Sequence, residues 1–314
     1  MSKTKGLPFE MRQHIKGHYK NRATRRAYKK HARYFWTFVK ERGYTANQVR
    51  ENPQLFLQAY ADQLVADKKS ANTIHTYLSF PCTFFGVPMS DIKKPPRTTA
   101  GITKSRGKGN AQGKREENLE KNARVVAFEK DAGVRRAEVK RLDGCNFKQD
   151  ESGYWCVEVI KGKGGKYHLQ RILPDDVEFV RSYFDGTEQK LFSRDEMNNK
   201  IDFHAMRSAK ARRAYDYYVE LLRDPAQRSK LLQELADRYC LYNVNYLKNN
   251  RDPKILAAFM RDCQGTYKLR GDTVTLAKSK DRPVVYDRTA VMAVSVFHLS
   301  HWRCGVAVRN YLLA

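Results

Sequence analysis

A tyrosine and a histidine stand close together near the end of this 314-residue chain. Tyr311 follows His301 by ten residues, in the segment LSHWRCGVAVRNYLLA. A phenol can attack a phosphate, but its pKa near about 10 keeps it protonated at neutral pH, so it needs a neighbouring base. The other groups that such chemistry requires occur in GVRRAE (residues 133–138), KGKGGK (161–166) and HAMR (204–207).

Two of these segments supply arginines. In a phosphoryl-transfer transition state, negative charge spreads over the nonbridging oxygens, and guanidinium groups match that geometry with charge-assisted hydrogen bonds. Arg207 is one candidate, and Arg135 is the other, because Glu138 follows it by three residues on the same face of a helix. The adjacent Arg136 is the alternative to Arg135.

The elements that must position these groups follow from local patterns. Asp202 can cap a helix on which His204 and Arg207, at i and i+3, project together. The glycine-rich turn at 161–166 lies between two alternating strands, which predicts a β-hairpin whose turn bears lysines.

The composition indicates a polyanionic partner. Sixty Lys and Arg against 34 Asp and Glu give a formal charge of +26, which favours nucleic acid because each neutralised phosphate releases counterions. An anionic membrane surface is the rival, yet no apolar run could span a bilayer. The six cysteines are scattered without zinc spacing, so we expect a cytoplasmic protein, associated with the nucleoid, that uses no metal and no cofactor.

The first part of the chain predicts a basic arm followed by a helical domain. Residues 1–21 show no sustained period and read as a loose arm. Residues 22–92 predict helices from Arg22, over Leu55–Ala66 and from Ser70, with Pro81 kinking or ending the last one. A plain helical bundle would explain the pattern, but the cationic face of every helix favours contact with DNA.

A basic linker without acidic residues covers residues 93–115. Such a run is often only solvated, but between two basic domains it fits a strap that follows a phosphate backbone. The candidate DNA-binding residues are Lys93, Lys94, Arg97, Lys104, Arg106 and Lys108.

A second domain is expected over residues 116–314. It begins with a helix near Glu116 that ends at Ala132, continues with the hairpin, and then becomes helical, so the fold class is mainly α with a small β-sheet (α+β). Residues 209–286 predict several further helices and a hairpin around Tyr267 to Tyr286.

The order of GVRRAE, VIKGKGGK, HAMR, LSH and a final tyrosine resembles the tyrosine recombinases, the phage-integrase family of site-specific DNA recombinases. That family's motifs read roughly TGLRxSEL, GKGxK, HxLR and LGHxxxxxT, ahead of a terminal tyrosine. The segment KKSANTIHTYLSFPCTFFGV also resembles the end of the family's helical core-binding domain. Each motif alone is weak, whereas their order is specific.

The resemblance implies a role for each residue. Arg135 and Arg207 would clamp the scissile phosphate, with Glu138 in support, and Tyr311 would attack to form a 3′-phosphotyrosine. Lys163, on a mobile hairpin, would return a proton to the leaving 5′ hydroxyl, with Lys161 and Lys166 as alternatives. His204 and His301 would complete the pocket and His204 would help deprotonate the tyrosine, while His298 is the alternative to His301.

The chain departs from the family at several positions. Ser208 and Phe203 replace a common histidine and proline, and the distance from Arg207 to His301 is unusually long, so residues 209–286 read as an insertion. This insertion is expected either to contact DNA or another protomer or to be an inert surface elaboration. Many relatives continue beyond the tyrosine into a tail that docks on the next subunit, and here such contacts are expected from elsewhere.

The resulting prediction is a recombinase that integrates or excises a mobile element. It would act on double-stranded DNA as a homo-tetramer on paired sites, with the two domains closing around the duplex and a possible accessory DNA-bending protein. A type IB topoisomerase-like enzyme is one alternative. A non-catalytic, basic DNA-binding protein with a degenerate site is the other.

Overall fold

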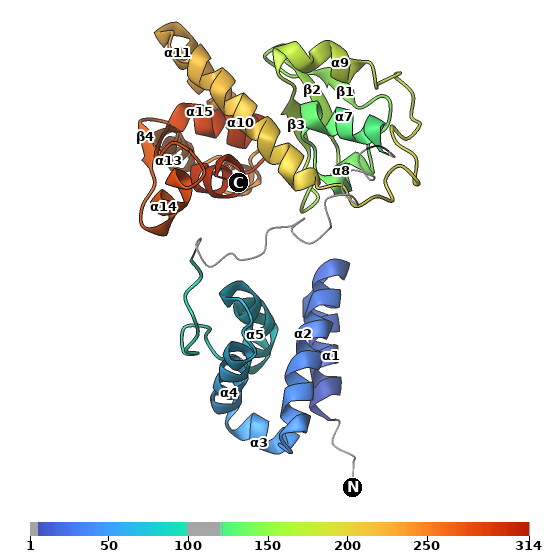
Figure 1. The fold of residues 1–314 in the computed structure, drawn as a ribbon, viewed down its shortest axis with the longest axis vertical. Helices are drawn as coiled ribbons and strands as arrows, with labels where there is room; N and C mark the ends of the chain where they lie inside the picture. The colour runs from blue at the N-terminus through green and yellow to red at the C-terminus, as the bar shows by residue number, and fades with distance from the viewer. Residues whose placement is uncertain (1–5, 99–119, 121, 314) are drawn as a thin grey trace. The chain divides into compact units, whose positions relative to one another are not determined.

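The chain forms two compact units, an N-terminal unit of residues 1–104 and a C-terminal unit of residues 105–314 (Figure 1). The computed structural model describes residues 6–98, 120 and 122–313. Of the predicted basic linker, residues 99–115 lie outside this description, as does the expected helix start near Glu116. Each unit is considered by itself below.

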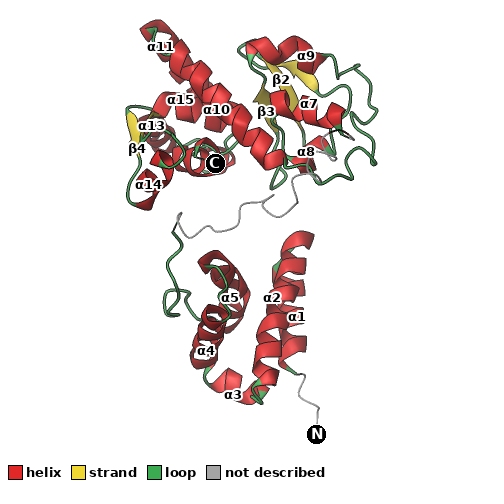
Figure 2. Ribbon diagram, viewed as in Figure 1, coloured by secondary structure: helices red, strands yellow, loops and turns green. Residues whose placement is uncertain are grey.

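The N-terminal unit is helical (Figure 2). The predicted helices are confirmed: the Asn21 side chain caps the first of them, Ser70 caps the last, and Gly43 follows the first with φ 71°. The last helix continues through Pro81 instead of ending there. Its helices are α1 (Leu7–His18), α2 (Arg22–Glu41), α3 (Ala46–Glu51), α4 (Pro53–Ala66) and α5 (Ala71–Phe85).

The prediction of a loose arm over residues 1–21 is wrong for α1. Leu7, Met11 and Ile15 recur at helical spacing and are fully buried in the same core as Phe35 and Leu78. The basic residues between them masked this apolar stripe, because three apolar positions on one face are enough to dock a short helix. Helix α1 is therefore part of the N-terminal fold.

Replacing Ile15 with alanine should loosen this unit. A buried isoleucine truncated to alanine typically costs about 2–5 kcal/mol of folding free energy, through lost burial and a residual cavity. Hydrogen–deuterium exchange of peptides from α1 and α2 should therefore speed up. Leu55→Ala is the matched control, because that side chain is 63% exposed; equal exchange in both variants would mean that α1 does not pack as described.

The first half of the C-terminal unit contains a small antiparallel sheet in the order β1-β2-β3 (Figure 2). Strand β2 (Trp155–Val159) pairs with β3 (His168–Arg171), which confirms the predicted hairpin. Strand β1 (Phe147–Gln149) escaped prediction because it is too short for a pattern. The sheet packs with α7 (Ala123–Ala132), α8 (Arg136–Val139), η1 (Pro174–Asp176) and α9 (Val177–Arg181) around Val125, Phe128, Val157, Val159 and Phe192.

The rest of this unit is helical. The helix that carries His204 and Arg207 continues to Leu221 as α10, so the expected separate helix from Ala209 is its second half. The remaining elements are α10 (Phe203–Leu221), α11 (Pro225–Tyr242), α12 (Val244–Lys248), α13 (Pro253–Asp262), β4 (Thr266–Lys268), α14 (Asp272–Lys278), β5 (Val285–Asp287), α15 (Arg288–Ala293), α16 (Cys304–Ala307) and the π-helical turns η2 (Val294–His298) and η3 (Val308–Leu312).

Residues 209–286 are not an inert surface elaboration. Their buried side chains, such as Tyr218, Leu235 and Phe259, share one core with Val291 and Leu312 from the C-terminal segment. The expected hairpin around Tyr267 to Tyr286 is present as the β4–β5 ladder, with α14 between the strands. The C-terminal helices therefore pack against this segment.

The predicted fold class, mainly α with small antiparallel sheets, is confirmed. Across the ranges that the structure describes, no helix has the length and apolar character needed to cross a membrane.

Candidate active site

Arg135 stands at the N-terminus of α8, next to the carboxylate of Glu138. Its Nη1 donates to Glu138 Oε1 at 2.8 Å and its backbone N–H to Oε2 at 3.3 Å. Glu138 is only 2% exposed, and although burial opposes the charge, the neighbouring Arg135 holds the pKa of that carboxyl below its usual range. The ionised carboxylate therefore fixes the direction of the guanidinium.

Arg207 projects from α10 into the same region. It is 2% exposed, and its Nη1 donates to Gln170 Oε1 at 3.0 Å and to the Gly133 carbonyl. Its Nη2 donates to the Leu299 carbonyl at 3.0 Å, and the Nη2 of Arg135 donates to the same oxygen at 2.8 Å. One backbone oxygen thus holds both guanidinium groups together, although they are 72 residues apart in sequence.

His301 and Tyr311 complete this cluster. The Nε2 atom of His301 lies 3.0 Å from the Tyr311 hydroxyl and 3.3 Å from Nη2 of Arg135. Because a guanidinium can only donate, the contact with Arg135 is a hydrogen bond only when Nε2 is unprotonated. In that tautomer the Tyr311 hydroxyl can donate toward the same nitrogen. The arrangement can therefore lead the phenolic proton to an imidazole.

The turn that carries His301 is strained. Ser300 and Trp302, on either side of it, have φ values of 54° and 59°, in a region that side-chain-bearing residues rarely adopt. Ser295 supports this turn: its carbonyl accepts from the His301 N–H at 2.8 Å, and its hydroxyl accepts from the Arg303 N–H at 3.0 Å. The strained backbone directs the imidazole at the tyrosine.

The His301 ring stays neutral in this environment. Burial, then the charges of Arg135 and Arg207, lower the pKa of His301 to about 3 from 6.5. Below pH 6.5 the His301 ring is protonated in the unfolded chain but stays neutral in the folded protein. This residue should therefore lower the folding stability as the pH falls from 6.5 to about 3. It contributes no such loss above pH 6.5.

We expect the ¹³C NMR signal of the His301 ring, assigned with His301→Gln, to show no titration between about pH 8 and pH 5 in the free protein. The same variant should lose less stability than the wild type on acidification below pH 6.5. A ring that titrates near its ordinary value would contradict the buried, arginine-flanked position.

His204 and Lys163 lie at the edges of the cluster. The His204 ring stands edge-on to Tyr311, with ring centroids 5.0 Å apart, and His301 makes a polar contact with the Tyr311 hydroxyl. Lys163 is exposed on the β2–β3 turn, where Gly164 and Gly165 adopt φ values of 79° and 76°. Its backbone N–H donates to Glu138 Oε1 at 3.2 Å, so one carboxylate joins this turn to Arg135.

The alternatives left open by the sequence differ in their contacts. Arg136 donates to the side chain and carbonyl of Asn199 and stacks over Phe203, so its guanidinium is engaged elsewhere. His298 is 3% exposed, and its Nε2 lies 3.2 Å from the Tyr218 hydroxyl. The structure therefore brings His301 to Tyr311 and Arg135 to His301, in place of these neighbours. Among the turn lysines, Lys163 contributes the charge that acts on His301.

Several groups that support the site were not predicted from the sequence. Gln170, on β3, accepts from Arg207. Glu129 is fully buried and accepts from the Val134 N–H at 3.0 Å, and burial raises its pKa well above the ordinary value. The sequence signal for the supporting role of Glu129 is an acidic residue at a buried position of α7. A buried carboxyl needs a hydrogen-bonding or charged partner, so such a residue points to a neighbouring polar group.

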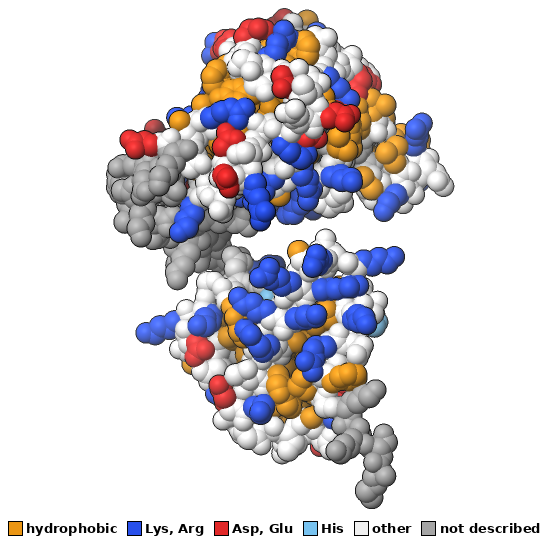
Figure 3. Space-filling model, turned by 90° about the vertical axis from the view of Figure 1, so that its right-hand side faces the viewer, with side chains coloured by type: hydrophobic (Ala, Val, Ile, Leu, Met, Phe, Trp, Pro, Cys, Tyr) orange, Lys and Arg blue, Asp and Glu red, His pale blue; other side chains and the backbone are white. Residues whose placement is uncertain are grey.

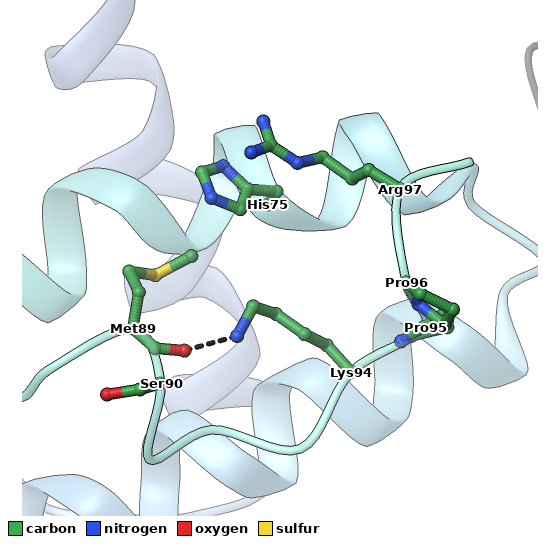
Figure 4. Close-up of a pocket in the computed structure, with 7 residues that line it drawn as sticks. All are labelled: His75, Met89, Ser90, Lys94, Pro95, Pro96 and Arg97. Atoms are coloured by element: carbon green, nitrogen blue, oxygen red, sulfur yellow. Dashed lines mark hydrogen bonds between the residues drawn. The ribbon is translucent and has the colours of Figure 1, made fainter. Parts of the chain in front are cut away.

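The candidate DNA-binding residues differ in whether their side chains make contacts within the protein. Lys94 turns back on its own loop, where Nζ donates to the carbonyls of Met89 and Ile92, beside a pocket that also exposes His75 and Arg97 (Figure 4). The Lys93 N–H donates to Gln58 at 2.7 Å, while its side chain is exposed. Lys104, Arg106 and Lys108 lie outside the described residues.

Comparison with known proteins gives little beyond these observations. No protein family and no curated protein matches the sequence. The crystal structure of XerA recombinase is similar over 66% of this chain and 82% of that one, with 16% identity and a TM-score of 0.23. At this level the similarity does not assign a family, and the proposals below rest on the geometry of the site.

Proposed function

We propose that this protein cleaves and rejoins DNA strands through Tyr311. The observation that carries this proposal is the hydrogen bond between the Tyr311 hydroxyl and His301, beside two arginines held by one carbonyl. The phenolic oxygen would attack the scissile phosphorus. Its proton would pass to His301 once the bound phosphate offsets the charges of Arg135 and Arg207, which lower the pKa of His301 in the free protein. The bond from phosphorus to the 5′ oxygen would break, leaving a 3′-phosphotyrosine, and the 5′ oxygen would take a proton from Lys163.

The two arginines suit the charge that develops in this step. Two guanidinium groups converge on one carbonyl, so a phosphate approaching Tyr311 would meet donors that are already oriented. Preorganised donors of this kind lower a barrier because they need no reorganisation during the reaction. The phosphodiester energy is kept in the phosphotyrosine, and the reverse attack by a 5′ hydroxyl would reseal the strand.

His301, in place of His204, is the base that this geometry supports. A base must lie within hydrogen-bonding reach of the proton it removes, and Nε2 of His301 satisfies this at 3.0 Å. His204 packs edge-on against the phenol ring and would hold its orientation. This assignment differs from the role that the sequence resemblance implied for His204.

Tyr311 would attack in the active site of its own chain. The Tyr311 carbonyl accepts from Arg212 at 3.3 Å, and the Leu313 carbonyl accepts from Lys280 at 2.8 Å. Leu312 and Leu313 are 2% and 1% exposed, so the segment bearing the tyrosine is part of the core. These contacts support cleavage in cis.

Double-stranded DNA is the substrate that the charge favours. The net charge is +26, and lysines and arginines gather on the viewed face of the N-terminal unit, which shows few acidic groups (Figure 3). We propose that both units bind the duplex and that four protomers exchange strands between two sites of a mobile element, with an accessory DNA-bending protein. The protein would then reside on the bacterial nucleoid.

The test uses nicked duplexes with randomised sequence around the nick, so that a short 5′ hydroxyl strand is lost after cleavage and the covalent product is trapped. We expect an SDS-resistant adduct, and mass spectrometry should place the nucleotide on Tyr311. Exchange between two selected sites would support a recombinase, whereas relaxation of supercoiled DNA alone would indicate a topoisomerase. Tight binding without any covalent product would refute the catalytic proposal.

A further inference from the structure

Helix α11 reaches the sheet through a cluster of buried charges. Glu234 and Arg238, one turn apart on α11, meet Asp150 and Arg171 from the sheet region. All four residues are buried, with exposed fractions of 8% for Glu234, 5% for Arg238, 8% for Asp150 and 1% for Arg171. Two acids and two arginines balance each other, which is the condition for keeping charges in a protein interior.

The contacts within this cluster are direct. Arg171 donates from Nε to Asp150 Oδ2 at 2.6 Å and from Nη1 to Glu234 Oε2 at 2.7 Å. Arg238 donates from Nη2 to the same Asp150 oxygen. The Asp150 carboxylate also accepts from the backbone N–H groups of Ser152 and Tyr154 at 3.0 Å each, in the loop before β2. The cluster therefore joins α11 to the loop before β2 and to Arg171 at the end of β3.

Two side chains of α11, Arg238 and Tyr242, make further contacts toward the lysine turn. Nη1 of Arg238 donates at 3.3 Å to the carbonyl of Leu169, on the edge strand β3. This hydrogen bond satisfies a carbonyl oxygen on the side of the strand where no neighbouring strand pairs with it. The Tyr242 ring packs 5.6 Å from that of Tyr167, the residue between the turn and β3, and its hydroxyl donates to Glu151. These contacts end a few residues from Lys163.

A buried ion-pair network of this kind is weak evidence for stability, because desolvation offsets most of its attraction. Its geometric effect is stronger, because each charge has fixed partners and the hairpin cannot shift relative to α11 without exposing one. On the other side, Glu138 and Arg141 hold the turn by accepting from Lys163 N–H and by donating to the Lys161 carbonyl. The returning strand is held by α11 at Leu169 and Arg171, and also through Gln170, which contacts Arg207 and the Ala132 carbonyl.

We propose that α11 is a brace that positions the β2–β3 turn, so that Arg238 and Asp150 act as positioning residues for proton donation by Lys163. This inference rests on the proposed function, in which Lys163 protonates the leaving 5′ oxygen. It gives residues 209–286 a role in the chemistry through the hairpin that carries Lys163.

The first test measures position without any reaction. The double variant Asp150→Asn with Arg238→Met removes one charge of each sign, so Arg171 and Glu234 keep each other neutral and the fold is retained. Hydrogen–deuterium exchange of peptides covering residues 160–167 should become about tenfold faster or more, because an unlocked segment opens more often. The control is Arg228→Met on the same helix, whose partner Asp287 lies away from the hairpin; unchanged exchange in the double variant would overturn the proposal.

The second test uses a duplex selected by covalent trapping, in two forms that differ only in the bridging 5′ atom. With oxygen, adduct formation by the double variant should fall about 100-fold, as misplacement of a catalytic group typically produces. With sulfur, the leaving thiolate needs no proton, so the same variant should stay within about threefold of the wild type. Lys163→Met should show the same rescue.

The outcomes separate the two proposals. If the wild type traps no duplex in the selection, the proposed function fails, and the exchange data alone decide whether α11 braces the turn. If the double variant loses activity equally with oxygen and sulfur, the network supports the fold in general and its positioning role is overturned. Rescue by sulfur in the double variant, with Arg228→Met unaffected, is the result we expect.

Discussion

Replacing Tyr311 with phenylalanine is expected to abolish the covalent bond to DNA while leaving the fold and DNA binding intact. The change removes one oxygen, the atom that lies 3.0 Å from His301 and that would attack phosphorus. No other group of the cluster can take its place, because arginine is always protonated and His301 faces the tyrosine rather than open space. Loss of one hydrogen bond should cost only about 0.5–1.5 kcal/mol of stability.

Tyr218→Phe is the matched control for this variant. Tyr218 is also buried, and its hydroxyl also contacts a histidine, His298, at 3.2 Å. It should lose similar stability but keep wild-type adduct formation in the nicked-duplex assay. An adduct that persists in Tyr311→Phe would place the nucleophile elsewhere and would remove the central assumption of the mechanism.

Arg207→Lys is expected to slow adduct formation by about 10²–10³, the typical cost of one preorganised donor in a transition state. Lysine keeps the positive charge but has no planar fork, and Arg207 uses separate nitrogens to reach Gln170 and Leu299. An ammonium group cannot keep both contacts and also face a phosphate. The effect should appear in the single-turnover rate measured at saturating DNA, where weaker binding has no influence.

Arg136→Lys tests whether this loss depends on position. Arg136 is the neighbour of Arg135 and is bound to Asn199, away from the tyrosine. It should change stability in urea by about 1 kcal/mol, as single substitutions commonly do, with little change in the rate. Equal losses of rate in Arg136→Lys and Arg207→Lys would mean that the two arginines are not distinguished by the site.

Local patterns were sufficient for the regular elements. Ser70 and Asp202 each cap a helix as predicted, because a cap depends on neighbours within three residues. The hairpin with its lysine turn was predictable for the same reason, since alternating strands and glycines are local features. The charge of +26 led to the prediction of a nucleic-acid partner, which stays a prediction.

Helix α1 and the segment 209–286 show where local patterns fail. The three apolar residues of α1 gain their meaning only from the core that covers them. Residues 209–286 look like an addition because of their length, but their side chains pack with Leu312 and its neighbours. In both segments the packing partners lie far away in the sequence. A prediction from a short stretch of sequence therefore cannot identify them.

The sequence by itself determined the types and order of the chemical groups: two arginines, a lysine turn, two histidines and a tyrosine. Only the tertiary structure decided that His301, in place of His298, contacts Tyr311, and that Arg135, in place of Arg136, contacts His301. The reason is that neighbouring residues on a helix or turn point in different directions. Which direction faces the site is fixed by distant contacts, here the Leu299 carbonyl that gathers both arginines.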